Sequence, residues 1–417
     1  MKVKKYVTDV FKDKYFNEEN VKFVVDNKEE NNIINIHPEI EFQDWLGLGG
    51  ALTDATLHNL NCLNEEKKKE LLSSYFKDLN YNFLRLPIGS TDFSVNLSED
   101  YTQGLERNVK LIQEIKQIRE VEIIATPWSP PAKFKSNSSL YGGKLLKEYY
   151  NDYANYLIKF IDDYVFFGIK INYLCVQNEP FANQAWESCT YEIEELKKFM
   201  YKYLIPKLKD TKIMLWEHNK DNLYNIFKNL YENNSKVKAV GFHWYTGAFF
   251  EELDLIRKNY PSILLFETEM CCGFSKYNKR KWVTDAEYYL NEIIGSMKHG
   301  LNAFIDWNLL LNFKGGPNHK HNFCKSPIIL NKRENDYVKT PIFYYLEHIG
   351  IANKANILAT STYSRDCNLQ VVALKNEKIY ITVLNKGNEK REVNIRIGNN
   401  LIKDKINKHS IVTYVVE

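Results

Sequence analysis

Eight short apolar runs recur along most of this 417-residue chain, and longer amphipathic stretches rich in charge separate them. The runs cover residues 45–50, 82–87, 121–128, 173–179, 213–216, 239–245, 263–269 and 303–308, and the clearest helical stretches cover residues 65–78, 105–119, 147–164, 193–208, 221–229 and 285–299. A strand buried on both faces is a short apolar run, whereas the helix that covers it is longer and periodic. The alternation is typical of βα units, and eight units predict an α/β fold, a (β/α)8 TIM barrel.

The alternation ends near residue 349, and both ends of the chain have a different pattern. Short alternating segments separated by turn residues occupy 369–374, 379–384, 392–397 and 411–416, and two similar segments, 21–25 and 33–36, precede the first barrel strand. Such segments predict antiparallel pairing. We therefore predict a flanking antiparallel β-sandwich built from both chain ends, with residues 1–40 and 350–417 in the sandwich and residues 41–349 in the barrel.

The overall composition excludes several classes of protein. Hydrophobic residues make up 44% of the chain, and the formal net charge of +3 is too small to predict binding to nucleic acid. No run is long enough to predict an integral membrane segment. The basic residues between Met1 and Tyr6 have no apolar segment after them, which predicts a cytoplasmic protein, or a secreted one if a signal peptide has been removed. The seven cysteines show no CxxC spacing and predict reduced thiols; nothing in the sequence indicates the oligomeric state.

Two of the apolar runs end on a glutamate. Glu179 follows the run 173–176 in the string VQNEP, and Glu269 follows the run 263–266 in LLFETEM. In a β/α barrel, side chains at the C-terminal ends of the strands build the active site. Two carboxyl groups there are the minimum equipment for retaining glycoside hydrolysis, in which they lie about 5–5.5 Å apart. The pair therefore predicts acid–base and nucleophilic chemistry.

The other predicted strand ends carry a coherent polar and aromatic set. A pyranose ring requires aromatic faces for its C–H surfaces and carboxylates or amides for its hydroxyl groups. The set supplies both, so it predicts a pocket for carbohydrate. Its members are Arg85, Asp92, Trp128, Asn178, Glu217, His243, Trp244, Tyr245, Trp307 and Asn308.

Eight strings, in order along the chain, resemble those of glycoside hydrolase family 30, and within it the glucosylceramidase-like branch. They are GLGGALTDAT (47–56), YNFLRLPIGSTDFS (81–94), IIATPWSPPAKFKSN (123–137), VQNEP (176–180), GFHWY (241–245), LLFETEMCCG (264–273), IDWNLLLN (305–312) and GGPNHKHNFCKSPII (315–329). The resemblance implies a retaining β-glycosidase with a (β/α)8 barrel and a β-sandwich made from both chain ends. Since both charges come from carboxyl groups, no metal or other cofactor is expected.

The resemblance also assigns roles to the two glutamates. Glu269 matches the nucleophile and Glu179 the general acid/base. Arg85 and the hydroxyl of Tyr245 are expected to hold and orient Glu269, and Asn178 is expected to hydrogen-bond the sugar 2-hydroxyl. Glu179 has to be protonated at rest, so burial is expected to raise its pKa.

Further positions are expected to bind the substrate. Those matched to the non-reducing sugar are Asp92, Trp128, Trp307 and Asn322, and those at the end of the sixth run are His243, Trp244 and Tyr245. Trp186 ends the short segment 181–186 and is expected to line the aglycone side. The implied substrate is a terminal β-linked glucose in glucosylceramide or a related β-glucoside, so the expected partner is a carbohydrate or a glycolipid.

Three alternatives remain open from the sequence. Within the same family the activity could be that of a β-1,6-glucanase, a β-xylosidase or a β-fucosidase. A carbohydrate-binding protein without catalysis would keep the barrel, although both carboxyl groups and their partners argue against it. A metal-dependent hydrolase would use His319 and His321, but two histidines in a loop without further ligands are a weak signal.

Overall fold

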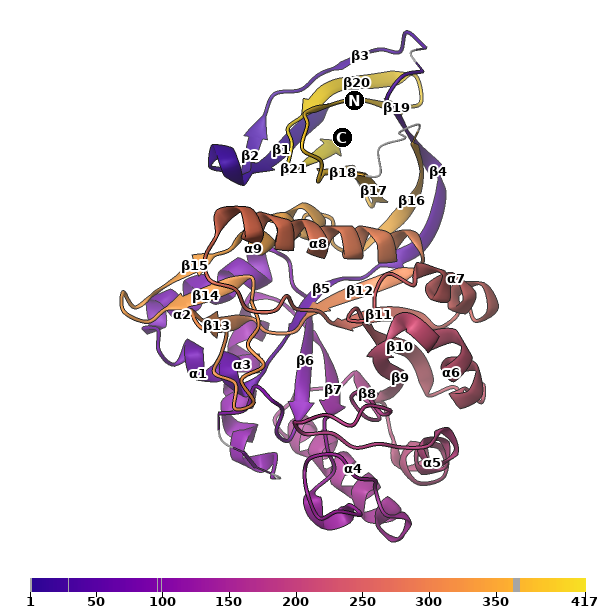
Figure 1. Ribbon diagram of the computed structural model, residues 1–417. Helices are drawn as coiled ribbons and strands as arrows, with labels where there is room; N and C mark the ends of the chain where they lie inside the picture. Colours follow the sequence, from indigo (N-terminus) through magenta and orange to yellow (C-terminus); the bar gives the residue numbers. More distant parts are fainter. Residues whose placement is uncertain (1, 29, 96, 99, 363–367) are drawn as a thin grey trace.

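The chain folds into a closed barrel and a separate sheet, as a computed structural model shows (Figure 1). The structure describes residues 2–28, 30–95, 97–98, 100–362 and 368–417. The barrel has eight parallel strands, and the sheet combines strands from both ends of the chain. The predicted fold is confirmed in both parts.

Each of the eight predicted runs overlaps a strand of the barrel. The strands are β5 (Gly47–Ala51), β6 (Phe83–Ile88), β7 (Glu122–Pro127), β8 (Tyr173–Cys175), β9 (Lys212–Asn219), β10 (Val237–His243), β11 (Leu264–Glu269) and β12 (Leu301–Asp306). Neighbours in sequence are neighbours in space, and β12 pairs with β5 to close the barrel. All strands run parallel, so their C-terminal ends meet at one face.

Strand β8 ends earlier than the sequence predicts, at Cys175 and not at Glu179. Beyond it the backbone bonds to both neighbouring segments: Asn178 N donates to Pro127 O at 2.8 Å, and Glu179 N donates to Glu217 O at 2.9 Å. These bonds draw the chain out of the regular ladder, and they fix the last residues of this segment across the mouth of the barrel.

The helices surround the barrel, and two of them separate it from the sheet (Figure 1). The α-helices are α1 (Asp54–Leu60), α2 (Glu65–Ser73), α3 (Thr102–Ile118), α4 (Tyr150–Phe166), α5 (Ile193–Lys198), α6 (Leu223–Leu230), α7 (Phe250–Asn259), α8 (Lys279–Lys298) and α9 (Pro341–Gly350). Helices α2 and α5 continue as the π-helical segments η2 (Ser74–Asp78) and η5 (Phe199–Leu204); short 3-10 turns are η1 (Val10–Lys12), η3 (Ala132–Phe134), η4 (Lys147–Tyr149), η6 (Ile205–Lys207) and η7 (Lys220–Asn222). Of the helices that the structure describes, none combines the length and apolar character needed to cross a bilayer.

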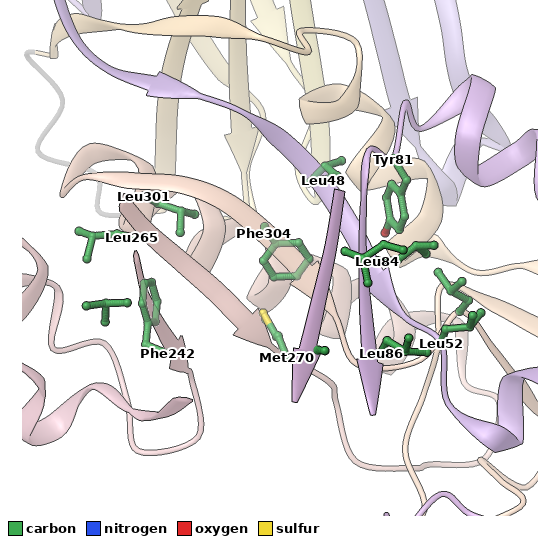
Figure 2. Packing of buried hydrophobic residues seen from close by; sticks show 14 of the residues in the cluster. Leu48, Leu52, Tyr81, Leu84, Leu86, Phe242, Leu265, Met270, Leu301 and Phe304 are labelled. Carbon is green, nitrogen blue, oxygen red and sulfur yellow. The ribbon is translucent and has the colours of Figure 1, made fainter. Parts of the chain in front are cut away.

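Apolar side chains pack on both sides of the barrel strands. The inner cluster consists of Phe83, Ile124, Tyr173, Cys175, Met214, Ala239, Phe266, Ala303 and Ile305. Figure 2 shows part of the larger outer cluster, including Leu84 from β6, Phe242 from β10 and Phe304 from β12. Burying one such side chain contributes roughly 1.5–3 kcal/mol, so the strand ends are attached to a rigid frame.

The sheet has ten strands in the order β2-β1-β21-β18-β17-β16-β4-β19-β20-β3. Its strands are β1 (Val3–Asp9), β2 (Lys14–Glu19), β3 (Phe23–Val25), β4 (Ile33–Trp45), β16 (Ala355–Thr362), β17 (Leu369–Lys375), β18 (Ile379–Asn385), β19 (Arg391–Ile397), β20 (Asn400–Ile406) and β21 (Ser410–Val416). Among the described strands of this sheet, β4 and β19 are the one pair that runs parallel. One apolar cluster contains side chains from strands of both chain ends, including Ile34, Ile395 and Tyr414.

Helices α8 and α9 lie between this sheet and the barrel (Figure 1). His348 of α9 is buried, with Nδ1 2.8 Å from Thr413 Oγ1 and Nε2 2.9 Å from Thr8 Oγ1. One helix therefore bonds to the strands of both chain ends. Strand β4 passes through the predicted boundary between residues 40 and 41, and the predicted division at 40/41 and 349/350 stays a prediction. A small third sheet contains β13 (Leu310–Asn312), β14 (Ile328–Asn331) and β15 (Asp336–Lys339).

Candidate active site

A cavity of about 550 Å³ lies at the C-terminal ends of the barrel strands. Ten residues of the predicted site line it: Asp92, Trp128, Asn178, Glu179, Trp186, Trp244, Tyr245, Glu269, Trp307 and Asn322. The remaining four, Arg85, Glu217, His243 and Asn308, are buried behind the lining, and Arg85 and His243 hydrogen-bond to lining residues. The structure thus brings all of the predicted site residues together.

Arg85 on β6 connects the ends of three other strands. Its Nη1 donates to Glu269 Oε2 at 2.6 Å, and its Nη2 donates to Asn178 Oδ1 at 2.8 Å and to a carboxylate oxygen of Glu217. Burial lowers the pKa of a guanidinium, but the charges of Glu217 and Glu269 raise the pKa of Arg85 above its ordinary value. A buried cation needs such partners, so this network holds the catalytic face of the barrel in one arrangement.

Glu217, near the end of β9, was predicted only as a member of the polar set, with no role of its own. Burial raises the pKa of its carboxyl group, but Arg85 and His243 lower that pKa to about 2. Glu217 is therefore charged at any physiological pH. Arg85 therefore has a second permanent counterion besides Glu269.

Glu269 is held through both carboxylate oxygens. Arg85 donates to Oε2, and the hydroxyl of Tyr245 donates to Oε1 at 3.0 Å. The predicted contacts of Arg85 and Tyr245 with Glu269 are thus present in the structure. Two donors from different strands fix the plane of this carboxylate, which is what a positioned nucleophile requires.

Glu179 lies against a histidine, and this overturns one expectation. His243 Nδ1 is 3.1 Å from Glu179 Oε1, and Gln184 Nε2 donates to Oε2 at 3.0 Å. Burial by itself raises the pKa of Glu179, but the hydrogen bond and charge of His243 lower it below its ordinary value. The prediction of a raised pKa was therefore wrong, because His243 comes from another strand and places a cation beside the carboxylate.

His243 lies between the two carboxyl groups. Its Nε2 is 4.0 Å from Glu269 Oε2, on the other side of the ring from Glu179. Burial lowers the pKa of the imidazole, but the charge of Glu269 and the bonds to Glu179 and Glu217 raise it to about 9. At neutral pH the imidazole is a cation that shares its Nδ1 proton with Glu179.

Three residues at these strand ends have left-handed backbone. Their φ angles are +46° at Glu179, +76° at Trp216 and +58° at Glu217. Such a conformation costs a side-chain-bearing residue roughly 1–3 kcal/mol and persists only where the surroundings enforce it. Here the bond from Glu179 N to Glu217 O at 2.9 Å joins two of them. Two of the three strained residues, Glu179 and Glu217, thus carry the carboxylates that contact His243 and Arg85.

Asp92 forms a second polar centre in the cavity. Its Oδ2 accepts from Asn318 Nδ2 at 3.1 Å and from Asn322 Nδ2 at 3.3 Å. Burial, followed by the charge of Glu269, raises the pKa of Asp92 to about 8. At neutral pH most of this carboxyl group is protonated, so it can both donate to and accept from a ligand hydroxyl.

Two tryptophans wall the cavity beside Arg85. The rings of Trp128 and Trp307 stack at a centroid distance of 5.1 Å with an interplanar angle of 16°. The Arg85 guanidinium lies 4.6 Å from the Trp128 ring and 5.3 Å from the Trp307 ring. Both indoles are almost fully buried and cannot rearrange freely. They form a fixed apolar surface of the kind that binds the C–H face of a sugar.

Sequence reasoning missed several contributors. Gln184 and Asn318 orient Glu179 and Asp92, and Cys271 and Cys324 line the cavity. The available signal was proximity: Gln184 is five residues after Glu179, and Asn318 and Cys324 are in the same matched string as Asn322.

His319 and His321, considered as metal ligands, contact different groups. His319 Nε2 is 3.4 Å from Glu187 Oε1, whereas the ring of His321 packs edge-on against Phe323. Across the described parts of the chain, no three His, Cys, Asp or Glu side chains are arranged to hold a metal ion.

The arrangement can carry out acid–base and nucleophilic chemistry on a bound sugar. One carboxylate is held by two donors, a second shares a proton with an imidazole, and a protonated carboxyl group and two indoles form a site for one ring. These are the parts that hydrolysis of a glycosidic bond needs.

Comparisons with known proteins agree with this geometry. The model of the glycosyl hydrolase family 30 TIM-barrel domain matches residues 46–351. Putative glucosylceramidase 3 of Caenorhabditis elegans is 30% identical over 361 residues, which cover 77% of this chain and 69% of that protein. The crystal structure of SrfJ from Salmonella typhimurium superposes with a TM-score of 0.92 at 30% identity, covering 100% of this chain and 99% of that one. An endo-1,6-beta-D-glucanase of Neurospora crassa is 24% identical over 300 residues, covering 65% of this chain and 61% of that protein.

Proposed function

This chain belongs to glycoside hydrolase family 30, and from that premise we propose that it is a retaining β-glucosidase of the glucosylceramidase type. It releases a terminal β-linked glucose in two displacements, through a covalent glycosyl-enzyme. The observation that carries the proposal is the candidate sugar site, in which Asp92 with its two amide partners and the Trp128–Trp307 stack share one cavity with Glu179 and Glu269.

In the first step Glu269 attacks the anomeric carbon. Arg85 and Tyr245 hold its two oxygens, so little reorientation is needed before attack. As the ester forms, the charge on Glu269 disappears, and Glu217 remains as the counterion of Arg85. The guanidinium therefore stays in place for the second step.

Glu179 serves as the acid in the first step and as the base in the second. Its proton comes from the pair that it forms with His243, which holds one proton at neutral pH. Moving that proton along the 3.1 Å hydrogen bond turns the carboxylate into the acid that the leaving oxygen needs. When Glu269 is esterified, the imidazole loses one of its stabilising charges, and Glu179 can accept a proton from water.

Asn178 contributes a donor to the sugar. Its Oδ1 accepts from Arg85 at 2.8 Å, which fixes the orientation of the amide. The Nδ2 group is then directed away from the guanidinium and can donate to the 2-hydroxyl. Hydrogen bonds at that hydroxyl strengthen toward the oxocarbenium-like transition state.

The stereochemistry of the product is the first test. We expect hydrolysis of an aryl β-glucoside to release β-glucose first, because two inversions restore the original configuration. Proton NMR of the anomeric signals, recorded before mutarotation, measures this directly. Initial formation of α-glucose would contradict the retaining mechanism and the predicted spacing of about 5–5.5 Å between the two carboxyl groups.

The sugar site predicts a preference for glucose. A site that pairs with each equatorial hydroxyl leaves buried polar groups unpaired when one is inverted, so we expect kcat/KM for a nitrophenyl β-galactoside about 10²-fold below that for the β-glucoside. The β-xyloside lacks the hydroxymethyl group and should be poorer but measurable. The panel also includes the β-fucoside. A fucoside or xyloside in first place would replace the glucosidase proposal and leave the mechanism unchanged.

Asp92→Asn is the matched variant for this panel. It keeps the shape of the side chain, but once its single oxygen accepts from Asn318 and Asn322, only an NH2 group, which cannot accept, is left for the sugar. We expect it to reduce the ratio between glucoside and galactoside, because the discriminating contact is weakened in the preferred substrate. An unchanged ratio would assign the discrimination to another residue.

The aglycone distinguishes two candidate substrates. A β-1,6-glucanase activity is favoured by the similarity to the Neurospora crassa endo-1,6-beta-D-glucanase. Glucosylceramide in detergent micelles tests the glucosylceramidase activity, and end-labelled β-1,6-linked gluco-oligosaccharides test the glucanase activity. Release of glucose from the lipid supports the glucosylceramidase type, whereas internal fragments of the labelled oligosaccharides would support the glucanase.

A further inference from the structure

Two thiols face each other in the wall of the cavity. Cys271, after β11, and Cys324, before β14, both line the cavity, and their sulfur atoms are 3.1 Å apart. Each residue is less than 10% exposed. The six cysteines that the structure describes are free thiols, and Cys367 lies outside the described residues. The close approach of these two sulfurs has no role in the proposed mechanism.

The backbone holds the two thiols in this position. Gly273 and Cys324 form an antiparallel bridge, and it is flanked by bonds from Lys325 N to Cys272 O at 2.8 Å and from Phe274 N to Phe323 O at 2.9 Å. Both thiols also pack in the apolar cluster that contains Trp128 and Trp307. The sulfur atoms therefore face each other on two segments that are already bonded together.

Each thiol is adjacent to a group that the site depends on. Cys271 Sγ is 3.4 Å from the hydroxyl of Tyr245, which donates to Glu269 Oε1. Cys324 is two residues after Asn322, whose amide donates to Asp92. A change at this pair reaches both the attacking carboxylate and the sugar-binding carboxyl group.

We propose that Cys271 and Cys324 form a dithiol site, which a peroxide converts to a disulfide with loss of glycosidase activity. One thiolate attacks a peroxide oxygen, the O–O bond breaks, and a sulfenic acid and hydroxide form. The second thiolate attacks the sulfenic sulfur, the S–S bond forms, and hydroxide leaves. The sum is two thiols and one hydrogen peroxide to one disulfide and two waters.

Closing the bond moves groups that the reaction needs. A disulfide brings the two sulfurs from 3.1 Å to about 2.05 Å, so together they move about 1 Å toward each other, and Cys271 Sγ moves relative to the Tyr245 hydroxyl. A displacement of about 1 Å near the reacting groups can cost on the order of 10²-fold in rate. We expect at least a tenfold loss of activity. This part rests on the proposed function, whereas the chemistry of the sulfur pair does not.

The pair should react slowly at neutral pH. The hydrogen bond to Cys324, together with burial, raises the pKa of the Cys271 thiol well above its ordinary value, so little thiolate is present. The rate of oxidation should rise as the pH is raised toward that pKa. An exposed redox-sensor thiol with a low pKa would instead react rapidly at neutral pH, so the pH dependence of the oxidation rate distinguishes the two kinds of site.

The test compares the wild type with single serine variants. Peroxide-treated wild type should lose two hydrogen atoms by intact mass, give a 271–324 cross-linked peptide, and regain activity with dithiothreitol. Cys272→Ser removes a neighbouring thiol that is equally buried and leaves Cys271 and Cys324 in place, so it should behave like wild type. Cys271→Ser and Cys324→Ser should not form the bond, and each should keep the activity it had before treatment. A cross-link between another pair, or equal reversible inactivation of Cys324→Ser, would overturn the proposal.

Phenylarsine oxide provides a second measurement that involves no oxidation. Its arsenic binds two neighbouring thiols and releases one water. We expect one equivalent bound by the wild type and by Cys272→Ser, and none by either variant that lacks one thiol of the pair, with circular dichroism confirming that the variants fold. Equal binding by Cys324→Ser would show that the pair is not the site. Because mass and arsenic binding do not depend on turnover, an enzyme without glucosidase activity would still give the dithiol result.

Discussion

Replacing Glu269 with glutamine should abolish turnover, with kcat reduced on the order of 10⁴-fold or more while the fold is kept. Glutamine fills the same space and can still meet Arg85 and Tyr245, but its amide cannot form the glycosyl ester. The measurement is kcat on an aryl β-glucoside, with melting temperature and circular dichroism as checks of the fold. Glu251→Gln removes the same charge from an exposed position of α7 and should leave kcat unchanged.

The covalent intermediate identifies the nucleophile independently. An activated fluoroglucoside should label the wild type at Glu269, and fragmentation of the peptide separates this residue from Glu267. In a Glu269→Gly variant, azide takes the place of the carboxylate and attacks from the same face, so the expected product is the α-glucosyl azide. Labelling of Glu217 or Glu267, or a β-azide from this variant, would overturn the assignment.

The Glu179→Ala variant should separate substrates by their leaving groups. A dinitrophenolate departs without protonation, so its release should be nearly normal, whereas substrates with basic leaving groups should lose roughly 10²–10⁴-fold in kcat/KM. Loss of the base should also slow hydrolysis of the glycosyl-enzyme, so kcat falls even for the activated substrate. The comparison of several aryl glucosides measures both effects.

Azide again gives the control. In Glu179→Ala, the glycosyl-enzyme is attacked by azide from the face that water normally uses, and the expected product is the β-glucosyl azide with a restored rate. Gln184→Glu is a useful companion, because it replaces the amide that donates to Glu179 with a second carboxyl group. Equal loss on good and poor leaving groups would assign Glu179 a structural role.

The barrel and most of the site could be predicted because they depend on local pattern. Each buried strand is an apolar run, and a residue at the C-terminal end of a barrel strand lies at the face that carries the active site. Helices α1, α7 and α9 were harder to recognise. Helix α1 has seven residues, about two turns, and depends on the side chain of Thr53, which accepts from Thr56 N, more than on its own periodicity.

The charge states of the site could not be predicted, since they depend on residues from different strands. His243 sets the pKa of Glu179, and Glu269 contributes to that of Asp92. Glu217 was visible at the end of a strand, but its role follows from a contact with Arg85, which is 132 positions away along the chain. The sequence pattern therefore locates a side chain at the end of a strand, whereas its contacts with residues of other strands determine its charge state and its role.

The pairing of β1 with β21 has a consequence for how the chain is made. Val3 lies opposite Val416, so about 400 residues must be added before β1 meets this neighbour. At about 5–20 residues per second that wait is roughly 20–80 s on the ribosome. The partner of β1 on its other edge is local: β2 lies within the first twenty residues, and Lys5 of β1 pairs with Glu19 of β2 at 3.2 Å. The edge of β1 that faces β21 stays without a partner until β21 has been made, so this part of the sheet is completed only by the last strand of the chain.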